Sequence, residues 1–86
     1  MKKIEIYTTN NCPFCVKAKT LLNKKNVMFN EVDVSNDNAL REKMSNMTNG
    51  KRSVPQIFIN NVYIGDCEKI YQLEKENKLN RLLGLD

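Results

Sequence analysis

The chain has 86 residues, of which 41% are hydrophobic and 28% are charged, and its formal net charge at pH 7 is +4. These values exclude the disordered and fibrous classes and suit one compact, water-soluble domain over residues 1–86. The N-terminus lacks a secretory segment of about 7 to 15 apolar residues, and no run reaches the roughly 18 that cross a bilayer, so we expect a cytoplasmic protein.

The first two predicted elements flank a pair of cysteines. "KKIEIYTT" alternates apolar and polar residues, which predicts a strand over residues 2–8. Pro13 suits the first turn of a helix. Apolar residues then recur at helical spacing and predict a helix over residues 13–25: Cys15, Ala18, Leu21 and Leu22.

A second strand and helix are predicted next. "VMFNEVDV", residues 27–34, is rich in β-forming residues and predicts a strand. "SNDN" supplies capping residues for a helix that carries Leu40, Met44 and Met47. Asn49 and Gly50 follow and should end this helix.

The last third of the chain predicts a hairpin and a helical end. "PQIFI" and "VYIG" are two short strands joined by Asn60 and Asn61, whose side chains tolerate the positive φ of a tight turn. Asp66 can cap a following helix that carries Ile70 and Leu73. One final helical turn or two is predicted by the leucines Leu79, Leu82 and Leu83.

These elements define an α/β protein with the order β-α-β-α-β-β-α. The early β-α-β unit implies parallel strands, and the hairpin implies antiparallel ones. We therefore expect a four-stranded mixed sheet flanked by helices.

The chain holds three cysteines, Cys12, Cys15 and Cys67, and no histidine. The lack of histidine excludes Ser-His and Cys-His catalysis and histidine metal ligands. A zinc site of four thiolates would need a second subunit, so no metal is expected. Without an export signal the expected compartment is reducing, which disfavours a permanent structural disulfide and favours redox chemistry.

Cys12 and Cys15 form a Cys-X-X-Cys pair where a strand passes into a helix. Unpaired amides and the helix dipole stabilise a thiolate at that end of a helix. Cys12 is therefore the predicted nucleophile. Cys15 lies about one turn further on and is the predicted resolving thiol.

Three stretches carry a family pattern: "IYTTNNCPFCVKAKTLL", "SVPQIFINNVYIGDCEKIYQL" and "LNRLLGLD". Through them the chain resembles a dithiol glutaredoxin of the thioredoxin superfamily over nearly its whole length. The resemblance implies a thioredoxin-like fold and glutathione as the reducing co-substrate. It also implies a cis bond before Pro55 and a glutathione groove beside Cys12, with the binding residues Phe14, Ser53, Val54, Pro55, Cys67 and Glu68.

Some positions depart from the family pattern. Thr9 stands where many glutaredoxins have a lysine, so Lys51 or Arg52 is expected to meet a glutathione carboxylate. Asp66 replaces the second glycine of a usual Gly-Gly pair, and Lys69 replaces an aspartate. Cys67 is interpreted as a small packed residue, with a redox role as the alternative.

The leading hypothesis is a glutathione-dependent oxidoreductase that reduces protein disulfides and glutathione mixed disulfides. Expected partners are glutathione and disulfide-containing or glutathionylated proteins, with ribonucleotide reductase as one candidate. We expect a monomer that binds no nucleic acid and no membrane, and the lysine clusters are interpreted as a solvated helix face. The alternatives are a thioredoxin-type donor recharged by a flavoprotein reductase, an iron-sulfur cluster carrier, disfavoured by Pro13, and a basic binding module.

Overall fold

Four strands form one mixed sheet in the computed structural model, which describes residues 2–86. The strands are β1 (Ile4–Thr8), β2 (Asn30–Asp33), β3 (Gln56–Ile59) and β4 (Val62–Gly65), in the order β2-β1-β3-β4. β1 pairs with β2 in parallel and with β3 antiparallel, and β3 and β4 form an antiparallel hairpin. The predicted mixed sheet is confirmed.

Four helices cover the sheet: α1 (Pro13–Lys24), α2 (Asn38–Met47), α3 (Cys67–Lys75) and α4 (Leu79–Leu83). The predicted order is confirmed, with α4 as the expected final turn. Asn77 separates α4 from α3 because it adopts a positive φ of 60°. β2 is shorter than the strand predicted over residues 27–34, since its pairing with β1 begins only at Asn30. None of the described helices is long and apolar enough to span a bilayer.

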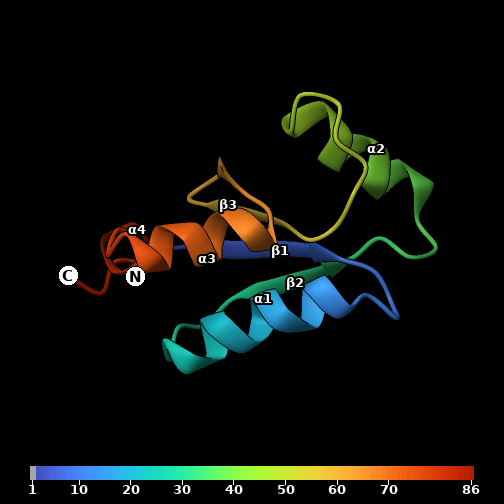
Figure 1. Ribbon diagram of the computed structural model, residues 1–86. Coiled ribbons are helices and arrows are strands. Elements are labelled where there is room, and N and C mark those ends of the chain that lie inside the picture. Colours follow the sequence, from blue (N-terminus) through green and yellow to red (C-terminus); the bar gives the residue numbers. More distant parts are fainter. Residues whose placement is uncertain (1) are drawn as a thin grey trace.

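The alternation of residues along the central strands divides the core between the two faces of the sheet. Ile4, Ile6, Ile57 and Ile59 face α1, α3 and α4 in the larger cluster. Tyr7 and Phe58 point to the other face and pack with Met44 of α2. Figure 1 shows the resulting layers, with α1 and α3 on one side of the sheet and α2 on the other.

The hairpin turn has the backbone that its sequence predicts. Asn60 and Asn61 have φ values of 50° and 66°, as a two-residue turn with two left-handed positions requires. The side chain of Asn60 accepts a hydrogen bond of 2.8 Å from the backbone amide of Lys3. The turn is thereby tied to the start of the chain.

Asp37 is the N-cap of α2, and its carboxylate accepts a hydrogen bond of 3.0 Å from the amide of Leu40. Replacing Asp37 with alanine should lower the free energy of unfolding by about 0.5–2 kcal/mol, because one end amide of the helix loses its partner. Urea denaturation measures this change. Asn38→Ala, one residue further on, is the matched control, and an equal loss in both variants would contradict the capping role.

Candidate active site

Cys12 and Cys15 lie where the chain leaves β1 and enters α1. Cys12 is the N-cap, Pro13 occupies the first turn, and the two cysteines form a disulfide with their Cα atoms 5.2 Å apart. The Cys12 sulfur accepts a hydrogen bond of 3.1 Å from the Cys15 amide. The backbone carbonyl of Cys12 accepts another, also of 3.1 Å, from the Val16 amide. Cys12 is half-buried, whereas Cys15 is only 1% exposed.

This geometry can support thiol–disulfide exchange. When the pair is reduced, the Cys15 amide and the dipole of the 12-residue helix α1 face the Cys12 sulfur, which favours its thiolate. A thiolate attacks sulfur far faster than a thiol does. Cys15 is buried and Cys12 is half-buried, so Cys12 is the more accessible sulfur of the pair.

The loop before β3 lies against the cysteine pair. The Val54–Pro55 bond is cis, as the resemblance implied, and the Cys12 sulfur lies 3.9 Å from the Val54 carbonyl oxygen. The buried side chain of Gln56 holds this loop, because its Nε2 donates a hydrogen bond of 2.9 Å to the Ser53 carbonyl. Tyr63 of β4 donates a hydrogen bond of 2.7 Å to Gln56 Oε1 and fixes that amide.

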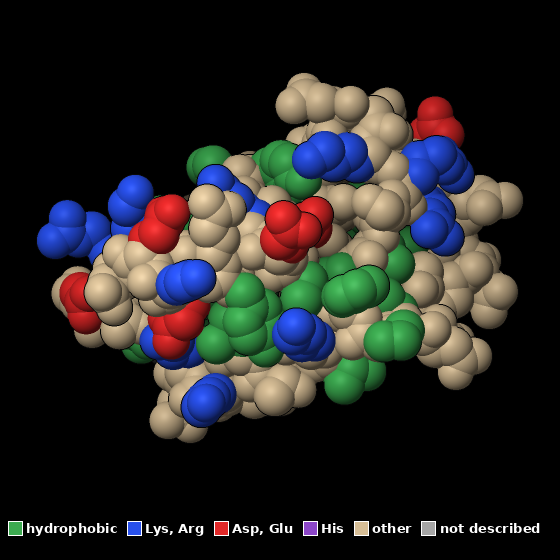
Figure 2. Space-filling view, viewed as in Figure 1, with side chains coloured by type: hydrophobic (Ala, Val, Ile, Leu, Met, Phe, Trp, Pro, Cys, Tyr) green, Lys and Arg blue, Asp and Glu red, His purple; other side chains and the backbone are tan. Residues whose placement is uncertain are grey.

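A groove of about 400 Å³ lies beside this loop, between α1 and α3. In Figure 2 an apolar region crosses this part of the surface, with acidic and basic side chains around it. The groove brings together all six residues that the resemblance assigned to glutathione: Phe14, Ser53, Val54, Pro55, Cys67 and Glu68. Phe14 is 63% exposed, so its ring is free to contact a ligand.

The groove is also lined by three residues that were not among those assigned to glutathione: Lys17, Asp66 and Tyr71. The Lys17 ammonium lies 5.0 Å from the centre of the Tyr71 ring, and the Tyr71 hydroxyl donates a hydrogen bond of 3.0 Å to the Lys17 carbonyl. Lys17 follows Phe14 by three residues on α1, and Tyr71 follows Cys67 by four on α3. Helical spacing from the assigned residues could therefore have found both.

A family model described as glutaredoxin matches residues 4–64. The chain belongs to the glutaredoxin family. Glutaredoxin 1 of Rickettsia prowazekii is 49% identical over 81 residues, which cover 93% of this chain and 85% of that protein. Glutaredoxin 3 of Escherichia coli K12 is 42% identical over 83 residues, covering 96% and 99% respectively.

The solved structures agree with this family. The solution structure of a glutaredoxin from Brucella melitensis is 43% identical and superposes with a TM-score of 0.85, covering 96% of this chain and 89% of that one. With the Cys12–Cys15 pair at the start of α1, this glutaredoxin is a thiol–disulfide oxidoreductase with a thioredoxin-like fold.

The third cysteine of this glutaredoxin lies in the groove but is closed to solvent. Cys67 is 5% exposed at the first residue of α3. Burial raises the pKa of its thiol, and the carboxylate of Asp66 adds to this effect while the nearby Lys17 opposes it. A thiol that stays protonated at neutral pH is a poor nucleophile, which favours the packed residue over a redox role.

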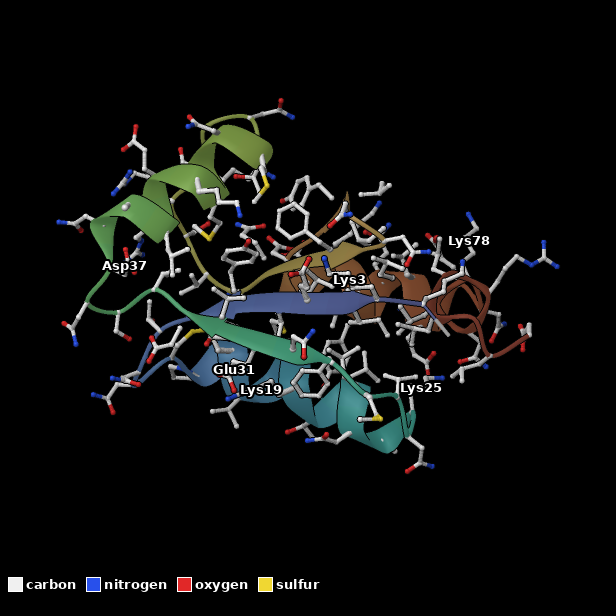
Figure 3. The ribbon with its side chains drawn as sticks, turned by 180° about the vertical axis from the view of Figure 1, so that it is seen from behind. Lys3, Lys19, Lys25, Glu31, Asp37 and Lys78 are labelled. Carbon is white, nitrogen blue, oxygen red and sulfur yellow. A yellow bond between two sulfur atoms is a disulfide. The ribbon has the colours of Figure 1, made fainter. Side chains whose placement is uncertain are left out.

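A polar cluster lies on the other side of α1, where a second hollow reaches the cysteine pair. Cys12 and Cys15 line this hollow together with Lys19 and Glu31. Lys19 and Thr8 each donate a hydrogen bond to the same oxygen of Glu31, at 2.8 and 2.7 Å. Figure 3 shows Lys19 and Glu31 side by side. The cluster joins α1 to β1 and β2 next to the hollow that the cysteines line.

These hydrogen bonds hold the pKa of Glu31 below its ordinary value of 4.5, the bond from Lys19 having the larger effect and that from Thr8 the next. Because the folded pKa is lower than the unfolded one, the ionised pair stabilises the fold above pH 4.5. That contribution is lost as the pH falls through the folded pKa.

Replacing Lys19 with glutamine should therefore cost up to about 1 kcal/mol of unfolding free energy at pH 7, since the pair is partly exposed. The difference from the parent protein should shrink as the pH falls below 4.5, because protonation of Glu31 removes the ion pair. Urea denaturation across this range measures it, with the exposed Lys24→Gln as the control on the same helix. A difference that does not change with pH would mean that the loss is one of packing alone.

The two cations expected to replace the missing lysine at Thr9 lie next to the groove. Lys51 lines a neighbouring hollow that shares Asp66 and Glu68 with the groove, and Arg52 directly precedes Ser53. Lys17 is the cation that lines the groove itself.

Within residues 2–86 no three side chains of cysteine, aspartate or glutamate gather as a metal site would require.

Proposed function

We propose that this glutaredoxin reduces protein disulfides and glutathione mixed disulfides at the expense of glutathione, with Cys12 as the attacking thiol and Cys15 as the resolving one. The observation that carries the proposal is the position of the Cys12 sulfur. The sulfur accepts the amide hydrogen bond at the start of α1 and lies 3.9 Å from the carbonyl oxygen of Val54, a residue that lines the groove. Membership of the glutaredoxin family supports glutathione as the electron donor.

With a glutathionylated protein, the Cys12 thiolate attacks the glutathione sulfur. A bond forms between Cys12 and glutathione, the bond to the protein sulfur breaks, and the protein thiolate leaves and takes up a proton. The thiolate of a second glutathione then attacks the bound glutathione sulfur. It forms oxidised glutathione and returns the Cys12 thiolate.

With a protein disulfide, Cys12 first forms a mixed disulfide with one sulfur of the substrate. Cys15 loses its proton and attacks the Cys12 sulfur, the protein thiolate leaves, and the Cys12–Cys15 disulfide of the present structure results. Two glutathione molecules then reduce this disulfide in two exchange steps and leave as oxidised glutathione.

The groove suits glutathione in shape and charge. Phe14 and Pro55 offer apolar contact, the backbone of Val54 offers peptide hydrogen bonds, and the first amides of the nine-residue helix α3, at Cys67 and Glu68, attract a carboxylate. Lys17 provides a cation in the groove for the other carboxylate. Asp66 and Glu68 can pair with the ammonium group of glutathione.

The same chemistry indicates the partners and the compartment. Disulfide-containing and glutathionylated proteins are the proposed substrates, with ribonucleotide reductase as a candidate among them. Reduced glutathione has to be abundant for turnover, which favours the cytoplasm. One chain contains both thiols and all residues of the groove, so the monomer over residues 1–86 is the proposed active unit.

A mapping experiment tests the assignment of the two thiols. Cys15→Ser treated with oxidised glutathione should gain one glutathione, located on Cys12 by peptide mass spectrometry, because no resolving thiol remains to remove it. Cys15→Ser combined with Cys67→Ser is the matched control and should give the same adduct. Modification chiefly at Cys67, or no adduct, would refute the assignment.

A further inference from the structure

A basic edge borders the groove on its α2 side. It consists of three residues: Arg41 of α2, and Lys51 and Arg52 in the loop that follows. Figure 2 shows Lys and Arg side chains gathered over α2 and this loop. The loop continues directly into Ser53, Val54 and Pro55, which line the groove.

Contacts within the protein hold the basic edge in place. Arg41 donates two hydrogen bonds, of 3.0 and 2.8 Å, to the carbonyl of Arg52. The Lys51 ammonium lies 3.4 Å from the Tyr63 hydroxyl and 5.6 Å from the centre of that ring. A charge that is already positioned loses less conformational freedom when a partner binds.

The basic edge keeps most of its positive charge. In the described part of the chain its one ion pair joins Arg52 to Glu42 at 3.4 Å, with side chains 51% and 68% exposed, so solvent screens it strongly. Neither Arg41 nor Lys51 forms an ion pair with a carboxylate of residues 2–86. Asp66 and Glu68 line both the groove and the neighbouring hollow that Lys51 lines, but neither forms an ion pair with the basic edge.

We propose that the basic edge docks an acidic polypeptide segment next to the reactive cysteine of a protein substrate. Val54, whose carbonyl lies 3.9 Å from the Cys12 sulfur, is two residues from Arg52. Two extended residues span about 7 Å, so acids within two or three positions of the substrate cysteine reach the edge. Asp66 and Glu68, which line the same hollow as Lys51, disfavour a long polyanion that would also cover them, which argues against nucleic acid. This inference rests on the proposed function.

Three short peptides test it, each with one glutathionylated cysteine flanked on both sides by aspartates, serines or lysines. The measurement is kcat/KM with glutathione as the reductant. At about 0.02 M salt the aspartate peptide should react about three- to tenfold faster than the lysine peptide. At about 0.5 M salt the difference should fall within about twofold, because ions screen exposed charges. All three peptides carry glutathione, so any effect on glutathione binding is the same for each and cancels in the ratio of their kcat/KM values.

The double variant Lys51→Glu with Arg52→Glu should invert the preference, so that the lysine peptide reacts faster. Lys24→Glu with Lys75→Glu changes the net charge equally and should keep the original ratio. Lys24 ends α1, roughly 18 Å along the helix from Cys12. Thermal unfolding of both double variants verifies that they fold.

Failure of the docking inference and failure of the proposed function give different results in this assay. Equal rates for the three peptides, or an unchanged ratio in the Lys51/Arg52 variant, would overturn the docking inference while the serine peptide still turns over. Equal peptide rates together with salt-sensitive binding of single-stranded DNA, lost in that variant, would assign the edge to nucleic acid instead. No turnover of the serine peptide would overturn the proposed function and the inference with it.

Discussion

Replacing Cys12 with serine should lower turnover of a glutathione mixed disulfide by at least about 1000-fold. A serine hydroxyl stays protonated near pH 7, so the helix start of α1 has no thiolate to stabilise and no nucleophile reaches the bound disulfide. A coupled assay that follows formation of oxidised glutathione measures this loss. Residual activity within tenfold of the parent would mean that another thiol performs the attack.

The two remaining cysteines provide the controls for this result. Cys15→Ser should keep turnover of glutathione mixed disulfides within several-fold, because a second glutathione replaces the resolving thiol, but should lose rapid reduction of protein disulfides. Cys67→Ser should stay close to the parent in both reactions, since the Cys67 thiol is 5% exposed and its pKa is raised by burial. A large loss in Cys67→Ser with an unchanged fold would restore a redox role for it.

Replacing Ile6 with alanine should cost about 2–5 kcal/mol of unfolding free energy. Ile6 is fully buried on β1, the strand that pairs with both β2 and β3, and it belongs to the core beneath α1 and α3. Removal of its side chain leaves a cavity that helices on one side and the sheet on the other cannot readily close. Urea denaturation measures the loss.

Two milder substitutions calibrate the effect of Ile6→Ala. Ile6→Val removes one methylene group and should cost about 0.5–1.5 kcal/mol. Val62→Ala, in a side chain that is 61% exposed on β4, should change the free energy of unfolding by less than about 0.5 kcal/mol. A loss below about 1 kcal/mol in Ile6→Ala would contradict the placement of this residue in the core.

Much of the fold was predictable because its signals are local. The two carboxylate caps, the proline that opens α1 and the asparagine turn of the hairpin each act through backbone groups within three residues. The alternation of Ile4 and Ile6 with polar neighbours likewise sets which side of β1 is buried. The start of β2 was placed too early, since the β-rich residues Val27 and Phe29 precede the point where pairing with β1 begins.

The candidate site was predictable only in part. The Cys-X-X-Cys spacing and the start of a helix already indicate the thiolate chemistry of Cys12. The glutathione residues came from the family resemblance, and the groove does gather those six positions. Lys17 and Tyr71 were not assigned, although each lies one helical turn beyond an assigned residue, Phe14 or Cys67. Their contact with each other was not predictable, because it joins residues 54 apart and depends on how α1 packs against α3.

The sequence by itself determined the order of the elements, the ends of the helices and the reactive cysteine pair, since each depends on neighbours along the chain. Only the tertiary structure decided which distant side chains share a surface. The Glu31 cluster depends on the register of β1 and β2, and the basic edge depends on the bond from Arg41 to the Arg52 carbonyl. Such contacts depend on the packing of whole elements, and no local periodicity encodes the position of one element against another.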